Sequence, residues 1–243
     1  MILNLIHLGR VDYATGLDLQ KQLAEARYEN RIGNTLVLLE HPPVLTLGRN
    51  SSRANILASD EFLAYRGVEI HEINRGGDVT YHGPGQLVGY PILDLRSFTL
   101  NNRRVGAVDY VRLLEESLIC ALGDFAVPAQ RIAGRTGVWT FPGGSVSEKK
   151  IAAIGVHISR GITSHGFALN VTTDLRDFDL IVPCGISDRT VTSLELEASD
   201  SMPPPTMENA INSVARQFGR VFEHQVLWLE PEQLPISLSA SVR

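Results

Sequence analysis

The feature that most constrains the fold of this chain is a series of short apolar segments that follow one another with no helix between most pairs. Runs rich in Val, Ile, Leu and Thr and bounded by Gly, Pro or Asn are typical of β-strands. The strands that we expect are 35–40, 44–47, 68–73, 87–95, 137–141, 150–158 and 166–171. Because adjacent strands lack intervening helices, the sequence predicts an α+β fold with a mixed or antiparallel sheet, not a doubly wound parallel one.

Four segments with helical periodicity predict the helices that flank this sheet. The helices that we expect are 12–30 with Asp12 as N-cap, 60–66 with Ser59 as N-cap, 104–122, and one that begins after Thr206. A triple proline at 203–205 sets the last helix apart from the rest of the chain. That helix is either a small separate lobe or part of one domain. We expect residues 201–243 to form a C-terminal helix and tail packed on a domain of residues 1–200.

Composition excludes several classes of protein. The 243 residues are 44% hydrophobic and 20% charged, which is typical of a globular chain with one substantial core. No apolar run approaches the roughly 18 residues that span a bilayer, and Met1–His7 lacks the basic segment of a signal peptide. We therefore expect a cytoplasmic protein with no membrane partner. The net charge of −5 predicts no nucleic-acid partner.

The cysteines and histidines predict neither a disulfide framework nor a metal site. The two cysteines, Cys120 and Cys184, form no CxxC motif, and the seven histidines show no HExxH spacing. Cys120 lies in the predicted long helix, so we expect a thiol in the core or at the helix edge. Cys184 lies in the apolar segment Ile181–Ile186, which Pro183 and Gly185 interrupt, and a loop is the expected setting.

Lys150 and Cys184 are the first candidates for chemistry. Lys150 opens the apolar strand 150–156, at the edge of the interior, and precedes Cys184 by 34 positions. A free cysteine is only about 3% thiolate at neutral pH, and lowering its pKa by roughly two units requires about 2.7 kcal/mol. A lysine ammonium at about 4 Å supplies up to roughly 4 kcal/mol before desolvation. The pair therefore makes an acyl-transferring nucleophile if the fold joins them; otherwise Cys184 is a buried small hydrophobe and Lys150 a surface charge.

The segment Arg75–Gln86, Arg-Gly-Gly-Asp-Val-Thr-Tyr-His-Gly-Pro-Gly-Gln, is the second candidate. Its glycines let the backbone approach a ligand and expose N–H groups, while Arg75 and His82 offer polar contacts. The glycine order is not that of a Rossmann or P-loop motif. A turn between two strands that binds no ligand is the alternative. A Cys/His dyad of Cys184 with His82 or His165 also stays open.

Seven basic residues lie in or beside the glycine-rich and strand-edge segments, whereas acidic residues concentrate elsewhere, notably in 195–200. The basic residues are Arg49, Arg53, Arg75, Arg131, Arg135, Lys149 and Arg160. A basic patch on an acidic protein indicates recognition of one anionic partner. Scattered arginines exposed to solvent are the alternative.

Four segments together resemble the lipoyl(octanoyl) transferase family, the octanoyltransferases of bacterial lipoate synthesis. They are the glycine-rich segment 75–86, Lys-Ile-Ala-Ala-Ile-Gly-Val at 150–156, His-Gly-Phe-Ala-Leu-Asn at 165–170 and Pro-Cys-Gly-Ile at 183–186. The resemblance runs from about His41 to Leu194, in the order of the family. It implies the fold of biotin and lipoate protein ligases, a mixed β-sheet flanked by helices with the acyl chain in a pocket.

The resemblance also implies the activity and the site. Cys184 would take an octanoyl group from octanoyl-acyl carrier protein as a thioester, and Lys150 would lower the pKa of the thiol and shuttle protons. The acceptors would be lysines of lipoyl domains in 2-oxoacid dehydrogenase complexes and of the glycine cleavage H protein. No cofactor and no metal are implied. The implied substrate-binding residues are Arg75, Gly76, Gly77, Asp78, Val79, Thr80, Tyr81, His82, Ala153, Ile154, Gly155, Gly166, Phe167 and Ala168.

Two other functions fit the same pattern. An ATP-dependent lipoate or biotin protein ligase of this fold would activate a free acid and would not need Cys184. A noncatalytic module that binds acyl carrier protein or lipoyl domains would keep the pocket without turnover. The presence of both Lys150 and Cys184 favours the acyltransferase, with residues 1–200 as its catalytic domain.

Overall fold

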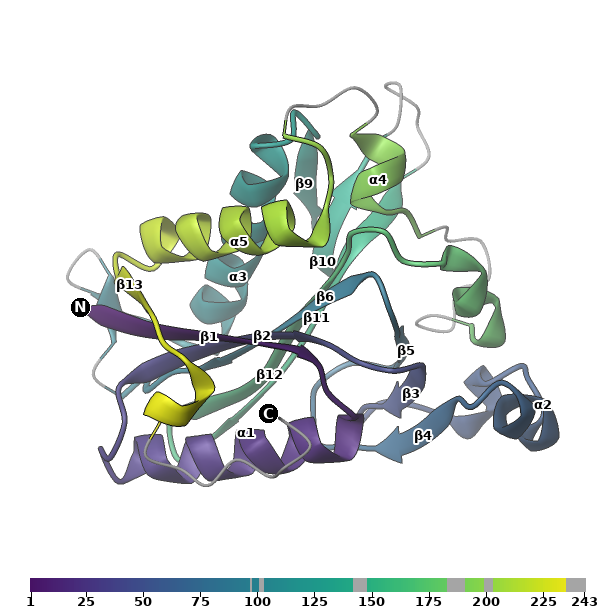
Figure 1. Cartoon of the computed structure of the whole chain (residues 1–243), viewed down its shortest axis with the longest axis horizontal. Helices are drawn as coiled ribbons and strands as arrows, with labels where there is room; N and C mark the ends of the chain where they lie inside the picture. Colours follow the sequence, from purple (N-terminus) through teal and green to yellow (C-terminus); the bar gives the residue numbers. More distant parts are fainter. Residues whose placement is uncertain (97, 101–102, 142–147, 183–190, 199–202, 235–243) are drawn as a thin grey trace.

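The computed structural model describes residues 1–96, 98–100, 103–141, 148–182, 191–198 and 203–234. Its centre is an eight-stranded sheet with the strand order β13-β1-β2-β6-β12-β11-β10-β9 (Figure 1). The strands are β1 (Ile2–Arg10), β2 (Asn34–Glu40), β6 (Gln86–Ile92), β9 (Ala129–Ile132), β10 (Arg135–Thr140), β11 (Lys149–Ser159), β12 (Ile162–Asn170) and β13 (Gln225–Trp228). β1 pairs in parallel with β13 and β2, and the other neighbours are antiparallel, so the predicted mixed sheet is confirmed.

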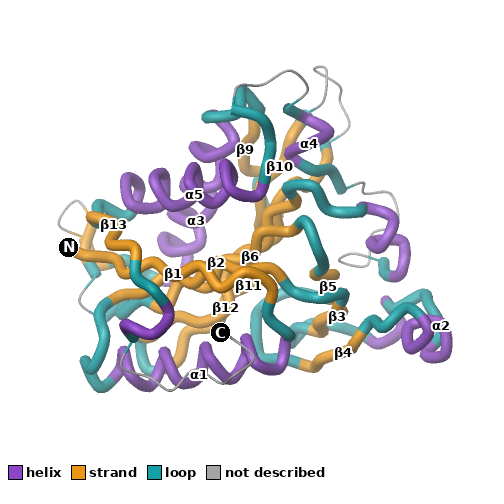
Figure 2. Tube along the Cα trace, in the orientation of Figure 1, coloured by secondary structure: helices purple, strands orange, loops and turns teal. Residues whose placement is uncertain are grey.

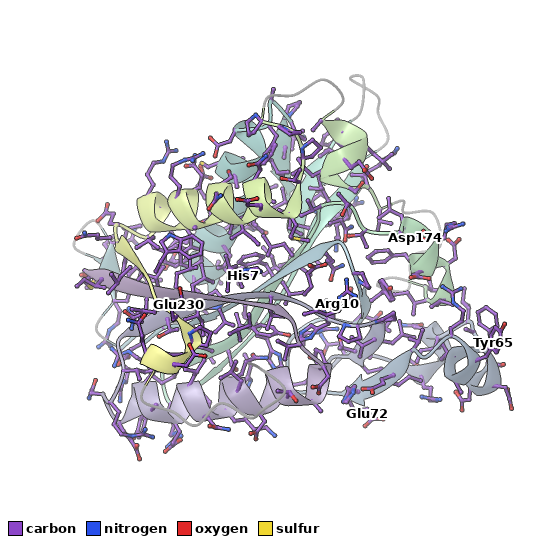
Figure 3. The ribbon with its side chains drawn as sticks, viewed as in Figure 1. His7, Arg10, Tyr65, Glu72, Asp174 and Glu230 are labelled. Carbon is purple, nitrogen blue, oxygen red and sulfur yellow. The ribbon has the colours of Figure 1, made fainter. Side chains whose placement is uncertain are left out.

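A smaller three-stranded sheet lies beside one end of the large one, with the order β4-β3-β5. Its strands are β3 (Val44–Leu47), β4 (Glu69–Glu72) and β5 (Val79–His82), and β7 (Thr99–Leu100) and β8 (Arg103–Arg104) form a separate two-stranded ribbon. The short elements η1 (Arg53–Asn55), α2 (Asp60–Tyr65) and η3 (Leu175–Leu180) lie on the side of the small sheet (Figure 2). Tyr65 on α2 projects from this end of the molecule (Figure 3).

Helices cover both faces of the large sheet because each face is apolar. α1 (Tyr13–Tyr28) lies below the sheet in Figure 1, while α3 (Ala107–Gly123) and α5 (Met207–Val221) lie above it. The cluster below includes Leu19 and Leu23 of α1, and the cluster above includes Leu118 of α3 and Phe218 of α5. The short helices α4 (Leu194–Glu197) and η5 (Pro231–Gln233) complete the described elements. None of the helices in the described part of the chain combines the length and apolar character needed to cross a bilayer.

Most of the predicted elements are confirmed, including the N-caps Asp12, Ser59 and Thr206, whose side chains each accept a hydrogen bond from a backbone N–H of the helix that follows. The predicted strands 137–141 and 150–158 form the antiparallel pair β10–β11, and residues 142–147 between them lie outside the described residues. The predicted start of the long helix at residue 104 is wrong, because α3 begins at Ala107 after the N-cap Gly106. Residues 103–104 instead form β8.

Candidate active site

Small residues on one face of β11 and β12 open a trough in the large sheet. Ala153 pairs with Ala168, and Gly155 pairs with Gly166. Between these pairs, Ile154 and Phe167 pack in the core beneath α3, and both also line the cavity described below. Because side chains alternate between the faces of a strand, the large residues fill the core while the small ones leave space on the side of α1.

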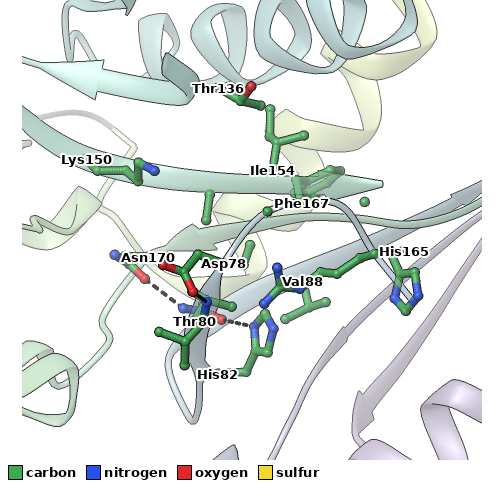
Figure 4. A pocket seen from close by; sticks show the side chains of 18 of the residues that line it. Asp78, Thr80, His82, Val88, Thr136, Lys150, Ile154, His165, Phe167 and Asn170 are labelled. Carbon is green, nitrogen blue, oxygen red and sulfur yellow. Dashed lines mark hydrogen bonds between the residues drawn. The ribbon is translucent and has the colours of Figure 1, made fainter. Parts of the chain in front are cut away.

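The trough forms the floor of a cavity of about 440 Å³ (Figure 4). This volume lies in the range of roughly 300–1,000 Å³ that is typical of small-molecule sites. Lys150, Asn170 and Thr80 lie towards one end of the view, Val88 near the middle, and His165 at the other end (Figure 4). Strand β5 and the glycine-rich segment before it form the facing wall, since Gly77, Asp78, Val79, Thr80 and His82 all line the cavity. A site with a polar end and an apolar middle suits an elongated ligand.

Arg75 crosses the cavity between the two sheets. Its Nη2 donates to the carbonyl oxygen of Thr46 at 2.8 Å and to the hydroxyl of Thr46 at 2.9 Å, while Nη1 donates to the carbonyl of Gly76 at 3.1 Å. A Cβ on Gly155 would lie 2.9 Å from Cδ of Arg75, and a Cβ on Gly48 would lie 2.7 Å from Nη1. The absence of side chains at these two glycines therefore makes room for the buried arginine.

A chain of hydrogen bonds joins His82 to the backbone beside Lys150. His82 Nδ1 donates to Gln86 Oε1 at 2.7 Å, because the amide nitrogen of Gln86 faces the Tyr81 carbonyl and Asn170 Oδ1 and must donate to them. The amide nitrogen of Asn170 in turn donates to the carbonyl of Thr192. This order leaves Nδ1 of His82 protonated and Nε2 as an acceptor.

The chain reaches Lys150 at its last member. The Thr192 N–H donates to the Lys150 carbonyl at 3.0 Å, so the segment that carries Val191 and Thr192 is fixed against β11. Asn170 and Gln86 thus tie the glycine-rich wall of the cavity to the strand that carries Lys150. This network holds the two walls in a fixed relation.

Two histidines and a tyrosine of the cavity wall are held in their neutral forms. Burial, together with the nearby His41, lowers the pKa of His82 to about 3. Burial, aided by the positive charge of Arg75, likewise lowers the pKa of His165 to about 4. Burial raises the pKa of Tyr13, which stacks on His82, to about 12. At neutral pH these histidines are hydrogen-bonding groups and not cations, so His82 and His165 are poor proton acceptors.

A β-bulge sets the place of Lys150 in the wall. β10 and β11 pair Val138 with Ala152 and Trp139 with Lys150, so Ile151 is the extra residue on β11. Bulges turn side chains away from the regular alternation. Lys150 Nζ lies 4.8 Å from the centre of the Trp139 ring, in cation–π contact, and Lys150 and Trp139 both line the cavity.

Cys184 lies outside the described residues, so the predicted contact between its thiol and Lys150 stays a prediction. The described chain on either side of it is tied to the cavity region. Val182 N–H donates to the carbonyl of Asn55, whose side chain donates to Asp78 in the cavity wall. On the other side, Val191 itself lines the cavity.

The structure brings most of the predicted site residues together. Those that line the cavity are Lys150, Arg75, Gly77, Asp78, Val79, Thr80, His82, Ala153, Ile154, Gly155, Gly166, Phe167 and Ala168. Gly76 and Tyr81 are not among the lining residues. Gly76 bonds through its N–H to the Val156 carbonyl, and the Tyr81 hydroxyl donates to Asp177 at 2.6 Å on the other side of β5.

Sequence reasoning did not select several lining residues, among them Tyr13, Gln86, Tyr90, Trp139 and Asn170. Gln86 and Asn170 are the last residues of the segments 75–86 and 165–170, and this position in two family motifs could have identified them as site residues. Tyr13 opens α1, and Trp139 lies on a strand with no polar motif, so only the fold brings them here.

The basic residues noted in the sequence are distributed among separate contacts. Arg53 pairs with Asp60, Arg131 with Glu116, Arg135 with Glu148 and Arg160 with Glu25, while Arg75 is buried in the cavity wall. The charges of the four paired arginines are therefore partly compensated by neighbouring carboxylates, and the anionic partner stays a prediction. Within the described ranges, no group of three or more His, Cys, Asp or Glu side chains is placed to hold a metal ion.

The fold defines the class of protein. Its architecture is shared with lipoate and biotin protein ligases: a lipoate-protein ligase A bound with ATP aligns with a TM-score of 0.71 at 15% identity, covering 100% of this chain and 91% of the other. A bipartite lipoate protein ligase of Thermoplasma acidophilum also aligns with a TM-score of 0.71, at 16% identity, covering 100% and 89%. A biotin protein ligase of Aquifex aeolicus aligns with a TM-score of 0.52 at 15% identity, covering 90% and 70%.

The sequence defines the family within that class. The chain belongs to the lipoyl protein ligase A/B catalytic domain family, which matches residues 12–219. It is 78% identical over 232 residues to an octanoyltransferase of Acidobacterium capsulatum, covering 95% of this chain and 94% of the relative. An octanoyltransferase of Koribacter versatilis is 52% identical over 250 residues, covering 100% and 96%.

Proposed function

We propose that this protein is an octanoyltransferase that moves an octanoyl group from octanoyl-acyl carrier protein, through a thioester on Cys184, to the lysine amine of a lipoyl domain in the cytoplasm. The observation that carries the proposal is the trough of small residues that ends at Lys150, in a chain 78% identical to an octanoyltransferase. Transfer from one thioester to another needs a nucleophile that is also a good leaving group, and a thiolate of lowered pKa satisfies both needs.

The trough supplies binding energy for the acyl chain. Ala153, Ala168 and Val88 offer apolar surface, and each methylene that leaves water contributes about 0.8 kcal/mol. The six methylenes of an octanoyl group therefore contribute roughly 5 kcal/mol. This energy would hold the carbonyl carbon at the Lys150 end, where attack takes place.

Lys150 has the electrostatic role in the first half-reaction. Its ammonium stabilises the Cys184 thiolate, which attacks the thioester carbon and expels the thiolate of the carrier. Backbone N–H groups of the glycine-rich segment or of Cys184 would stabilise the oxyanion. In the second half-reaction the neutral amine of the acceptor lysine attacks the acyl-enzyme and forms an amide, and the Cys184 thiolate leaves. Lys150 gives its proton to the expelled carrier thiolate in the first half-reaction, and as a neutral amine it accepts the proton that the attacking amine loses in the second, which restores the ammonium beside the Cys184 thiolate.

The acceptors in this proposal are the lipoyl domains of 2-oxoacid dehydrogenase complexes and the glycine cleavage H protein. No nucleotide is consumed, because the thioester is already activated. This separates the transferase from an ATP-dependent ligase of the same fold, which would make an acyl-adenylate from a free acid.

Intact-mass measurement tests the proposal. The protein is incubated with octanoyl-acyl carrier protein in the absence of ATP, and we expect an added octanoyl group that hydroxylamine removes. Cys184→Ser should abolish the adduct, whereas Cys120→Ser, the matched cysteine control, should keep it. Failure of the wild-type protein to acylate would refute the transferase, and acylation that requires ATP and octanoic acid would identify a ligase.

A further inference from the structure

We propose that the Arg75 side chain is the end stop of the acyl trough and so sets the length of acyl chain that the enzyme transfers. This inference rests on the proposed function, because it assigns a specificity-determining residue to the same site. The trough begins at the Lys150 and Asn170 end, continues between Ala153 and Ala168, and reaches the pair Gly155 and Gly166. At Gly155 the side chain of Arg75 crosses it.

The crossing is fixed by contacts at both ends of the Arg75 side chain. Its methylene stem lies over Gly155 beside the Gly76 backbone, since an added Cβ would stand 2.9 Å from Cδ of Arg75 and 2.9 Å from the Gly76 carbonyl oxygen. Its guanidinium is held by two hydrogen bonds to Thr46, a residue of the small sheet. Arg75 is only 7% exposed, so it cannot swing away into solvent without leaving these partners. A methyl group at the end of an acyl chain would meet the apolar stem, and the charge would stay with Thr46.

The length of the trough fits a chain of about eight carbons. Because Ile151 forms the bulge, the path from Lys150 to Gly155 advances by about four regular residue steps, or roughly 13 Å, along the strand. Seven carbon–carbon bonds of about 1.5 Å, in a zigzag, advance roughly 9 Å. The remaining distance accommodates the thioester group beside Lys150 and the van der Waals radii at the two ends. A chain of twelve carbons would advance roughly 5 Å further and collide with Arg75.

A matched pair of variants separates the effect of the bulk of the Arg75 side chain on acyl-chain preference from the effect of its charge. Arg75→Met and Arg75→Ala both remove the guanidinium and its hydrogen bonds to Thr46, but only Arg75→Met keeps an unbranched stem over Gly155. The measurement is kcat/KM for carrier protein loaded with chains of six, eight, ten, twelve and fourteen carbons. We expect kcat/KM of the wild-type protein and of Arg75→Met to fall at least tenfold when the acyl chain lengthens from eight to twelve carbons. We expect Arg75→Ala to raise the ratio of kcat/KM for the twelve-carbon chain to kcat/KM for the eight-carbon chain at least tenfold over the wild-type ratio.

Equal length profiles for Arg75→Ala and Arg75→Met would overturn the inference, as would a wild-type protein that uses twelve carbons as well as eight. If neither Arg75 variant folds, Ala153→Leu tests the same path in a chain that keeps the arginine. A leucine at position 153 would fill the trough between Lys150 and Arg75, so the preferred chain should shorten from eight to six carbons. An unchanged preference would show that the chain does not lie there.

Calorimetric binding of acyl pantetheine amides, in which an amide replaces the reactive thioester, distinguishes failure of the inference from failure of the proposed function. If the wild-type protein transfers no acyl group, the proposed function is wrong. The amide series then still tests the end stop. Affinity that falls beyond eight carbons in the wild-type protein and in Arg75→Met, but persists to twelve in Arg75→Ala, supports it. Affinity independent of position 75 refutes it.

Discussion

Three histidines beside the cavity are held uncharged by burial. Burial lowers the pKa of His41 to about 4, of His82 to about 3 and of His165 to about 4, whereas an exposed histidine titrates near 6.5. Between pH 6.5 and pH 4 the unfolded chain therefore binds protons that the folded chain does not. The free energy of unfolding must fall as the pH decreases through this window.

Urea unfolding between pH 7 and pH 4.5 measures this loss. We expect each of the three histidines to contribute at most about 1.4 kcal/mol of destabilisation per pH unit below 6.5. His41→Gln should lower the slope of the free energy of unfolding against pH by the contribution of one histidine. It also disturbs the contacts of His41 with Val11 and Tyr90. A free energy of unfolding that is constant from pH 6.5 to pH 5 would contradict the buried neutral state.

The adjacent lysines 149 and 150 allow a sharp test of the electrostatic role of Lys150. Successive residues of a strand point to opposite faces, and only Lys150 lines the cavity. We expect Lys150→Ala to slow alkylation of Cys184 by iodoacetamide roughly tenfold at pH 7, with recovery at alkaline pH, because the thiol loses its stabilising cation. Lys149→Ala should leave the labelling profile close to that of the wild type.

Alkylation of the second thiol does not obscure this result. Cys120 lies on α3, and its burial, together with the charge of Glu116, raises the pKa of its thiol, so it reacts slowly at neutral pH. A Cys120→Ser background removes it altogether. A labelling profile of Cys184 that is identical with and without Lys150 would end the proposed role of that lysine.

At the scale of elements, periodicity and caps predicted long or strongly apolar segments and missed short ones. The sequence pattern does not identify β1, because its apolar start is also typical of a signal segment, and β9 and β13 have four residues each, too few for a clear period. β5 lies inside the glycine-rich segment, whose composition indicates a turn. Its strand character comes from pairing with β3, a contact between segments far apart in the chain.

Site residues that belong to a motif within one strand could be predicted from the sequence. Features of the site that depend on which strands become neighbours could not. Ala153, Gly155 and Ala168 were selected through the resemblance, but their cross-strand register, which makes the trough, is a property of the β11–β12 pairing. Tyr13 and Trp139 reach the cavity from α1 and β10. No local pattern distinguishes them from ordinary core residues, because their role depends on which elements become neighbours.

The bulge between β10 and β11 depends on Gly137. Its φ of 121° is in a region that favours glycine, and a Cβ there would lie 2.7 Å from the Ala152 carbonyl oxygen. We expect Gly137→Ala to lower the free energy of unfolding by about 1–3 kcal/mol and to displace Lys150, whose Cε lies 3.4 Å from that Cβ position. Urea unfolding and the rate of acylation measure the two effects.

Gly134→Ala is the matched control for this bulge, because Gly134 also has a positive φ, of 76°, but nothing lies within 4 Å of its Cβ position. It should carry only the conformational cost of roughly 1 kcal/mol. Equal costs at the two positions would mean that the contact with Ala152 does not determine the geometry of the bulge.

At the scale of the whole molecule, polar contacts join the two sheets around the cavity: the Gly76 N–H donates to the Val156 carbonyl on β11, and the Gln86 amide on β6 donates to the Tyr81 carbonyl on β5. Arg75 connects the glycine-rich segment to Thr46 on β3, and Asp177 of η3 accepts from both Tyr81 on β5 and Arg66 after α2. The small sheet and η3 are therefore held together beside the trough by buried or half-buried hydrogen bonds. Such contacts depend on direction, so they fix the position of the facing wall more closely than apolar packing alone.

Phe218 tests whether the C-terminal helix belongs to the same cooperative unit as the cavity. It is fully buried, stacks on Phe222 with ring centres 4.1 Å apart, and shares one apolar core with Ile151 of β11 and Leu169 of β12. We expect Phe218→Ala to cost about 3–5 kcal/mol and to lower Tm by roughly 10 °C. Val108→Ala, at an exposed position of α3, should change stability by less than about 0.5 kcal/mol.

Phe218→Ala should destabilise α5 and the cavity strands together, because removal of the buried ring leaves a void in the core that they share. Near-ultraviolet circular dichroism of Trp139, in a Trp228→Phe background, reports on the cavity strands, and far-ultraviolet dichroism reports on the helices. In the Phe218→Ala protein the two signals should be lost together at the lowered Tm. A helix signal that melts early while the Trp139 signal keeps the wild-type Tm would mean that residues 201–243 form a separate lobe.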